Sequence, residues 1–348
     1  MTDKGSSIDK SIIDYINEQF DPSMNWKDAE YCVKKWNGPF ALKGVMSVED
    51  AKKAINAAEI AFESWAKVSP RDRSVILRKA YELFMDKIEH FAELITLENG
   101  KAYGDAKGEA LYSAEFFRWY SEEAVRGIGQ ISHAPATGAR IVVQYKPIGI
   151  SVLVTPWNYP AAMGTRKIGP ALAAGCPVII KPASETPLTM LALMPILEKA
   201  GVPPGVVNVL PSRSSGSVVA AILKDRRTRV ISFTGSTEVG RQILHAAADN
   251  VIKPAMELGG NAPFIVCEDA NLEAAADGLM VAKMRNLGEA CTAANRIYVH
   301  ENVELEFVER FVKKMAKLKI LIAGSTGYIG IQLIKILSKH KNVHIEYL

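Results

Sequence analysis

The segment SVLVTPWNYP, residues 151–160, decides the fold because a short apolar run ends abruptly in a polar turn. The run at residues 151–154 has the length and composition of a buried strand. Similar runs follow at residues 178–181, 206–210, 230–233 and 263–266. Helical patterns lie between them, for example at residues 188–199 and 239–248. This alternation predicts a doubly wound parallel sheet.

Ligands of such sheets bind at the carboxyl ends of the strands. Trp157, Lys181 and Gly235 lie at or just after predicted strand ends. We therefore expect these three residues to line a dinucleotide site. A search for metal-ligand spacing finds none, because Cys32, Cys176, Cys267 and Cys291 are widely scattered.

Helical patterns dominate the region before the first strand. Ser47-Val48-Glu49-Asp50 is a capping-box sequence, and apolar residues follow it at helical spacing. Ser69-Pro70 predicts the start of one long amphipathic helix that runs toward Asn99-Gly100, and a third helix is expected at about 110–125. Residues 141–145 and 147–149 are predicted to form a strand pair.

Composition excludes several classes of protein. The 348 residues carry 42 basic and 38 acidic side chains, and the formal charge of +4 argues against a nucleic-acid partner. No apolar run approaches bilayer length, and residues 1–7 lack a signal-type apolar core. Together with the scattered cysteines, these features predict a cytoplasmic protein with no membrane association.

Four motifs occur in a fixed order along the chain. They are TPWNYP at 155–160, FTGSTEVG at 233–240, MELGGNAP at 256–263 and NLGEACTAANR at 286–296. In that order they resemble the aldehyde dehydrogenase superfamily. The last motif, with Thr165-Arg166-Lys167, is most similar to succinate-semialdehyde dehydrogenases. The resemblance covers about residues 47–317 and implies an α/β, Rossmann-type doubly wound parallel sheet with N-terminal helices and a truncated catalytic domain.

The resemblance also implies catalytic roles. Cys291 would attack the aldehyde carbonyl, the Asn158 amide and the Cys291 backbone N–H would stabilise the oxyanion, and Glu257 would activate water. Blander interpretations exist for each residue taken alone. A lone cysteine is usually a small buried hydrophobe, Asn158 could shape a turn, and Glu257 could be a solvated strand end.

The cofactor expected from the resemblance is NADP, with NAD possible. A serine at 184 beside Lys181 suits a 2′-phosphate, because NAD-preferring relatives commonly carry a carboxylate there. Glu185, one position on, weakens this preference. Trp157, Gly235, Ser236 and Leu258 complete the expected cofactor-binding residues.

The substrate is expected to be succinate semialdehyde, because Arg166 and Arg285 match arginines that hold the distal carboxylate in similar enzymes. The alternative for each arginine is a structural ion pair. Two other functions stay open. One is a non-catalytic fragment that retains at most dinucleotide binding, and the other is oxidation of a different small aldehyde.

The two ends resemble other dehydrogenases. Residues 1–46 resemble a piece of the flavin-dependent 2-hydroxy-acid dehydrogenases, in which the lysine matching Lys43 contacts flavin; here we interpret Lys43 as solvated. Residues 318–348 resemble the start of N-acetyl-γ-glutamyl-phosphate reductase. We therefore predict a chimeric chain with a cofactor-binding domain at 47–258, which includes an oligomerisation hairpin at about 138–150. A truncated catalytic domain follows at 259–317. The resemblance implies a homo-oligomeric family, and we expect this chain to lack the family's C-terminal oligomerisation strand.

Overall fold

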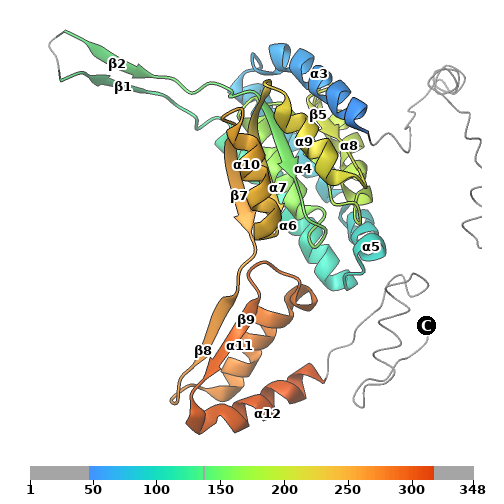
Figure 1. Ribbon diagram of the computed structural model, residues 1–348, viewed down its shortest axis with the longest axis vertical. Helices are drawn as coiled ribbons and strands as arrows, with labels where there is room; N and C mark the ends of the chain where they lie inside the picture. Colours follow the sequence, from blue (N-terminus) through green and yellow to red (C-terminus); the bar gives the residue numbers. More distant parts are fainter. Residues whose placement is uncertain (1–46, 136–137, 317–348) are drawn as a thin grey trace, which may run out of the picture. The chain divides into compact units, whose positions relative to one another are not determined.

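The computed structural model in Figure 1 describes residues 47–135 and 138–316. The chain divides into two units, Met1–Val45 and Met46–Leu348, and all described residues lie in the second. The predictions for residues 1–46 and 318–348 fall outside the described residues. Among the described residues, no helix is long and apolar enough to cross a membrane, and no cluster of His, Cys, Asp or Glu could hold a metal ion.

Within the described residues, four helices precede the sheet: α3 (Val48–Trp65), α4 (Pro70–Met85), α5 (Ile88–Asn99) and α6 (Tyr103–Glu123). The capping box is confirmed, since the Ser47 backbone N–H donates to the Asp50 carboxylate at 2.9 Å. Ser69 caps α4 by accepting from the Asp72 N–H at 3.1 Å.

The single long helix predicted after Ser69 was wrong. Helix α4 ends at Met85 and helix α5 begins at Ile88. Across this break, the Phe84 ring stacks on the Phe91 ring with centroids 4.2 Å apart. The break therefore places two large apolar side chains in one core. The helix predicted at about 110–125 is α6, which begins at Tyr103, seven residues before the predicted start.

The central sheet has five parallel strands in the order β5-β4-β3-β6-β7. They are β3 (Ile150–Val154), β4 (Val178–Lys181), β5 (Val207–Val209), β6 (Thr228–Gly235) and β7 (Lys253–Leu258). The crossover helices are α7 (Ala162–Ala173), α8 (Leu188–Ala200), α9 (Ser215–Lys224) and α10 (Thr237–Ala248). The doubly wound parallel sheet is thus confirmed. Strand order reverses at β3, so the switch point lies between β3 and β6.

Helices cover both faces of this sheet (Figure 1). Leu153 and Ile180 belong to the core formed with helices α4 to α8, whereas Val152 and Ile179 belong to the core formed with α3, α9 and α10. Neighbouring residues of a strand point to opposite faces, so strands buried on both sides become the continuous apolar runs seen in the sequence.

A second, smaller sheet follows the first. Strands β8 (Ala262–Val266) and β9 (Ala294–Val299) pair in parallel, and α11 (Leu272–Met284) and α12 (Glu304–Met315) pack with them. The strand predicted at 263–266 exists, but its assignment to the main sheet was wrong. The fifth main strand is β7, which carries Pro254 at the sheet edge and has no buried residue.

The strand pairing in the hairpin also differs from the prediction. Strand β2 (Arg140–Val143) pairs antiparallel with β1 (Gln130–His133) and not with residues 147–149. All eight residues of the two strands are exposed. Figure 1 shows the hairpin projecting from the five-stranded sheet.

Candidate active site

A cavity of about 810 Å³ lies at the carboxyl ends of β3, β6 and β7, beside α6 and the segment 285–292. Nine of the predicted site residues line it: Trp157, Asn158, Arg166, Gly235, Ser236, Glu257, Leu258, Arg285 and Cys291. Lys181 and Ser184 do not. The motifs at 155–160, 233–240, 256–263 and 286–296 therefore meet at one site although they are far apart in the sequence.

The segment that carries Cys291 has an unusual backbone. It begins with the short helix η1 (Arg285–Gly288), in which Asn286 and Leu287 have φ values of 53° and 54° and Gly288 has a φ of 84°. L side chains rarely adopt this left-handed conformation, and each such residue costs on the order of 1–3 kcal/mol. The buried Asn286 side chain donates to the Asn158 carbonyl at 3.1 Å, which ties the segment to the loop after β3.

Cys291 itself is exposed, so the interpretation as an inert buried cysteine does not hold. Among the described residues, no acceptor bonds the Cys291 backbone N–H. Both features suit a thiol that must meet a substrate and a backbone donor that must meet an oxyanion.

The side chain of Asn158 already makes one hydrogen bond. Its amide nitrogen donates to the backbone carbonyl of Glu289, two residues before Cys291. The amide carries two hydrogens, so one is committed to this bond and one is available. The Asn158 Oδ1 atom and the Thr234 hydroxyl are buried, and neither has a hydrogen-bond partner among the described residues. Both residues line the cavity, where a bound ligand could satisfy them.

Glu257 lies one residue before the end of β7, exposed and in register with Thr234 of β6. Among residues 47–135 and 138–316 it forms no ion pair. A general base should not be locked in such a pair, because its proton affinity would fall. Nearby Lys167 is buried and donates to the Ser232 hydroxyl at 2.6 Å. Burial lowers the pKa of Lys167 to about 8, although the charge of Glu257 opposes the shift.

The expected cofactor residues lie around the switch point. Gly235 ends β6, and Ser236 caps α10 by accepting from the Val239 N–H at 3.3 Å. Buried Lys181 ends β4, and burial lowers its pKa while Glu185 opposes the shift. The Ser184 hydroxyl donates to the Glu185 carboxylate at 3.2 Å. A helix N-terminus, a lysine and a hydroxyl are each donors that suit the phosphates of a dinucleotide, although Lys181 and Ser184 lie outside the cavity.

Neither Arg166 nor Arg285 forms an ion pair within the described residues, so the alternative role of a structural ion pair is not supported there. The Arg166 guanidinium donates to the Tyr112 hydroxyl at 2.7 Å. It also lies 5.3 Å from the centroid of the Phe116 ring. Burial raises the pKa of Tyr159, and the adjacent Arg285 charge opposes that shift. Two cations without carboxylate partners therefore face the cavity.

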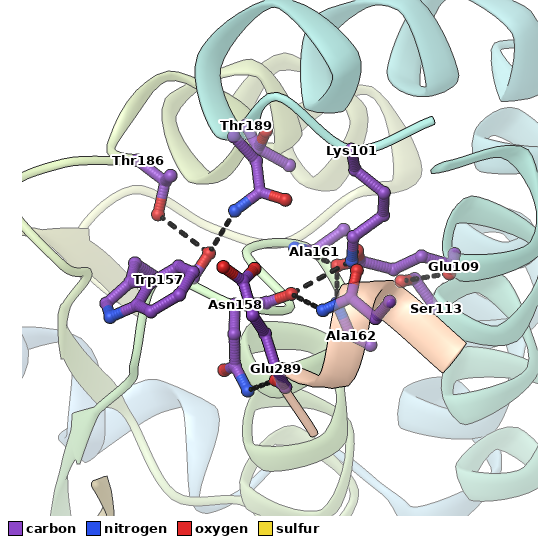
Figure 2. Close-up of polar contacts among 12 residues, drawn as sticks. Lys101, Glu109, Ser113, Trp157, Asn158, Ala161, Ala162, Thr186, Thr189 and Glu289 are labelled. Carbon is purple, nitrogen blue, oxygen red and sulfur yellow. Dashed lines mark hydrogen bonds and ion pairs between the residues drawn. The ribbon is translucent and has the colours of Figure 1, made fainter. Parts of the chain in front are cut away.

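The sequence analysis missed a buried ion pair between Lys101 and Glu109 (Figure 2). The exposed fractions of the two side chains are 1% and 0%. Burial lowers the pKa of Lys101 and raises the pKa of Glu109, and each partner's charge opposes the shift of the other. The only sequence signal was Glu109 on the apolar face of a helix, between Ala106 and Ala110.

Fold and site together define a class of α/β protein that presents an exposed cysteine in a cavity at the carboxyl edge of a doubly wound sheet. The family model described as "Aldehyde dehydrogenase family" matches residues 41–324, and the chain belongs to that family. A second model, "FMN-dependent dehydrogenase", matches residues 2–59. The resemblances of residues 1–46 and 318–348 to other enzymes stay predictions, as does the chimeric origin of the chain.

Individual relatives agree with the family. A succinate-semialdehyde dehydrogenase of Paenarthrobacter nicotinovorans is 50% identical over 270 residues, which are 78% of this chain and 60% of that protein. An NADP-dependent succinate-semialdehyde dehydrogenase of Schizosaccharomyces pombe is 46% identical over a region that covers 86% of this chain and 61% of that protein. The crystal structure of an Escherichia coli NADP-dependent enzyme superposes with a TM-score of 0.76 at 44% identity, over 78% of this chain and 56% of that one. This chain thus spans about 60% of the length of the curated relatives it matches.

Proposed function

We propose that this chain oxidises succinate semialdehyde to succinate with NADP as cofactor. The observation that carries the proposal is the single cavity lined by Cys291, Asn158 and Glu257 together with the two arginines Arg166 and Arg285. The cysteine, amide and carboxylate supply the chemistry of aldehyde oxidation, and the arginines supply a cationic subsite for a second functional group.

Cys291 begins the reaction as a nucleophile. Its thiolate attacks the carbonyl carbon, an S–C bond forms, and the carbonyl electron pair moves to oxygen. The Cys291 backbone N–H, which has no acceptor within the described part of the chain, and the second hydrogen of the Asn158 amide donate to that oxygen. Donors of this kind contribute about 3–4 kcal/mol each to transition-state stabilisation.

NADP, when bound, supplies the acceptor for the hydride that leaves the thiohemiacetal carbon. The N-terminus of α10, with Gly235 and Ser236, is placed to hold the pyrophosphate. Lys181 is a donor available for a 2′-phosphate, and Ser184 becomes a second donor once its hydroxyl turns away from Glu185. The Ser184–Glu185 hydrogen bond puts a carboxylate beside this position, and a carboxylate repels a 2′-phosphate, so we expect only a small preference for NADP over NAD.

Glu257 completes the cycle by releasing the thioester. Its carboxylate takes a proton from water, the resulting hydroxide attacks the acyl carbon, and the Cys291 thiolate leaves. Its position near the end of β7 and its freedom from ion pairs within the described residues support this role. The Gly259-Gly260 pair follows after Leu258 and gives the backbone beside Glu257 room to move.

The hairpin of β1 and β2 supports a proposal about assembly. Ile131, Ile141 and Val142 are all exposed on it, with Ile131 76% exposed. Because the family's equivalent hairpin contributes to oligomers, we propose that this hairpin contacts another subunit. A cytoplasmic location stays a prediction from the cysteine pattern.

The substrate is tested with Arg166→Ala, assayed by NADPH formation with succinate semialdehyde and with butanal, which lacks the carboxylate. We expect kcat/KM for succinate semialdehyde to fall about 10- to 100-fold and butanal turnover to change little, since a bidentate arginine contact to a carboxylate is lost. Arg213→Ala is the matched control, because Arg213 is exposed and does not line the cavity. Equal losses with both aldehydes would contradict the assignment of succinate semialdehyde.

The non-catalytic alternative makes a different prediction. A folded chain that binds NADP yet gives no NADPH with any aldehyde would support it. Cys291→Ala then provides the baseline, because turnover by the unaltered chain must exceed turnover by this variant.

A further inference from the structure

The end of helix α5 contacts the loop that carries Asn158. Gly100 ends the helix in the left-handed conformation, with a φ of 81°. On either side of it, the Asn99 amide donates to the Trp157 carbonyl at 3.0 Å and the Lys101 ammonium donates to the Asn158 carbonyl at 2.9 Å. Two residues separated by one glycine therefore hold two consecutive carbonyls of the loop.

Glu109, the buried partner of Lys101, holds the same loop where it enters α7. Its carboxylate accepts from the backbone N–H groups of Ala161 and Ala162 at 2.9 and 3.2 Å. N–H groups at a helix N-terminus have no acceptor within the helix, and a negative charge beside them is favourable, so the Glu109 carboxylate suits this position. Figure 2 shows the Lys101 side chain reaching between Asn158 and Glu109. One ion pair thus fixes residue 158 through its carbonyl and residues 161 and 162 through their amides.

The ring of Tyr159 lies within this frame. The Lys101 ammonium is 3.9 Å from its centroid, a favourable cation–π distance. Tyr159 lines the cavity and lies next to Arg285. The ion pair therefore touches every residue from the oxyanion donor to the start of α7, except Pro160.

Stability alone is a poor reason for this arrangement. Removing two charges from water costs several kcal/mol per ion, and apolar replacements of buried ion pairs are often neutral or stabilising. What the charges add is direction, because the ammonium and the carboxylate each point hydrogen bonds at defined backbone atoms. We propose that Lys101, with Asn99 and Glu109, is a positioning residue that orients the Asn158 amide toward the aldehyde oxygen. This inference rests on the proposed function.

The decisive variant is Lys101→Met/Glu109→Gln. The single change Lys101→Met leaves a buried carboxylate unpaired, so it would destabilise the fold and confound any activity measurement. The second change removes that charge, yet the glutamine oxygen can still accept from the Ala161 and Ala162 N–H groups. The double variant should therefore recover thermal stability while the Asn158 carbonyl still lacks its lysine donor.

An exposed ion pair provides the matched control. Lys107 and Glu89 connect α6 to α5, with exposed side-chain fractions of 43% and 59%. Lys107→Met/Glu89→Gln applies the same two types of substitution to an exposed pair in the same helical region without touching the loop. We expect this control to retain unaltered kinetic constants.

The first readout is steady-state oxidation of succinate semialdehyde. In Lys101→Met/Glu109→Gln we expect kcat to fall about 10- to 100-fold, below the full loss of an oxyanion donor of about 100- to 1000-fold. The KM for the aldehyde should change less than threefold, because Arg166 and Arg285 are untouched. A purely structural role would lower the amount of active enzyme without this lasting deficit in a variant of restored stability.

The second readout needs neither cofactor nor turnover. Succinate semialdehyde adds reversibly to Cys291: the S–C bond forms, the carbonyl pair moves to oxygen, and that oxygen takes a proton. The adduct protects the thiol from iodoacetamide, and alkylation of the peptide with Cys291 is followed by mass spectrometry. Exposed Cys267 is the internal reference. The concentration that gives half-protection should rise about tenfold in Lys101→Met/Glu109→Gln.

The outcomes separate this inference from the proposed function. If the unaltered chain shows protection without turnover, and the double variant loses protection, the dehydrogenase function fails but the positioning role stands. Wild-type kcat and wild-type protection in the double variant would overturn the positioning role. Absence of protection in the unaltered chain would remove the oxyanion site and the positioning role with it.

Discussion

At the scale of single residues, Glu257 offers the sharpest prediction because its proposed role falls after aldehyde oxidation. Glu257→Gln should lower steady-state turnover about 100-fold or more, since general-base catalysis contributes about 10²–10⁴-fold. The first turnover should survive as a burst of one NADPH per Cys291, measured by stopped-flow absorbance. A burst lost in proportion to the steady state would assign Glu257 to an earlier step.

Sequence motifs located most of these residues, but they could not describe their bonding. Local sequence motifs were enough to assign Cys291, Glu257 and Arg166, and all three residues line one cavity. The bond from Asn158 to the Glu289 carbonyl depends on the left-handed backbone around residue 287, which no motif encodes. Lys101 was missed because a charged residue after a helix is normally solvated, and only the packing of α5, α6 and α7 buries it.

At the scale of elements, helix α7 carries a testable electrostatic cost through buried Lys167. Its pKa is lowered to about 8 in the folded chain, against about 10.4 for an unperturbed lysine. Between these values the unfolded chain binds more protons, so the free energy of unfolding rises with pH and the penalty is complete below pH 8. We expect a rise of about 3 kcal/mol across this window that Lys167→Met lacks. Urea unfolding at pH 7.5, 9 and 10.5 measures it, and parallel pH profiles for the two proteins would contradict it.

The elements themselves were predicted unevenly, for physical reasons. Strands β3, β4 and β6 were identified because burial on both faces makes them apolar runs, whereas β7 was missed because its edge position exposes Lys253, Pro254 and Glu257. Periodicity continued through residues 86 and 87, so the break between α4 and α5 escaped detection. The predicted partner of β2 was wrong because strand pairing depends on contacts between segments distant in the sequence, which a local sequence pattern does not reveal.

At the scale of the whole molecule, the five-stranded main sheet and the two-stranded sheet of β8 and β9 have separate hydrophobic cores. The main sheet contributes to two large cores, whereas β8, β9, α11 and α12 share a small one around Phe307, which is 2% exposed. Residues 262–316 contain no tryptophan, while Trp65 and Trp119 lie among the helices before the sheet. The predicted domain boundary between residues 258 and 259 put strand 263–266 in the second domain, but its apolar composition also led us to count it with the main sheet.

We therefore expect Phe307→Ala to uncouple chemistry from nucleotide binding. Truncating a buried phenylalanine costs about 3–5 kcal/mol, a large share of what a small core supplies. Hydrogen exchange of peptides within 262–316 should accelerate and aldehyde turnover should be lost, because Cys291 lies between α11 and β9. The tryptophan-detected unfolding midpoint and NADP binding should persist. Phe84→Ala, in the core of α4 to α8, is the matched control and should lower that midpoint instead. If Phe307→Ala also lowered the tryptophan midpoint, the two sheets would unfold as one cooperative unit, and the active site would depend on the stability of the whole molecule.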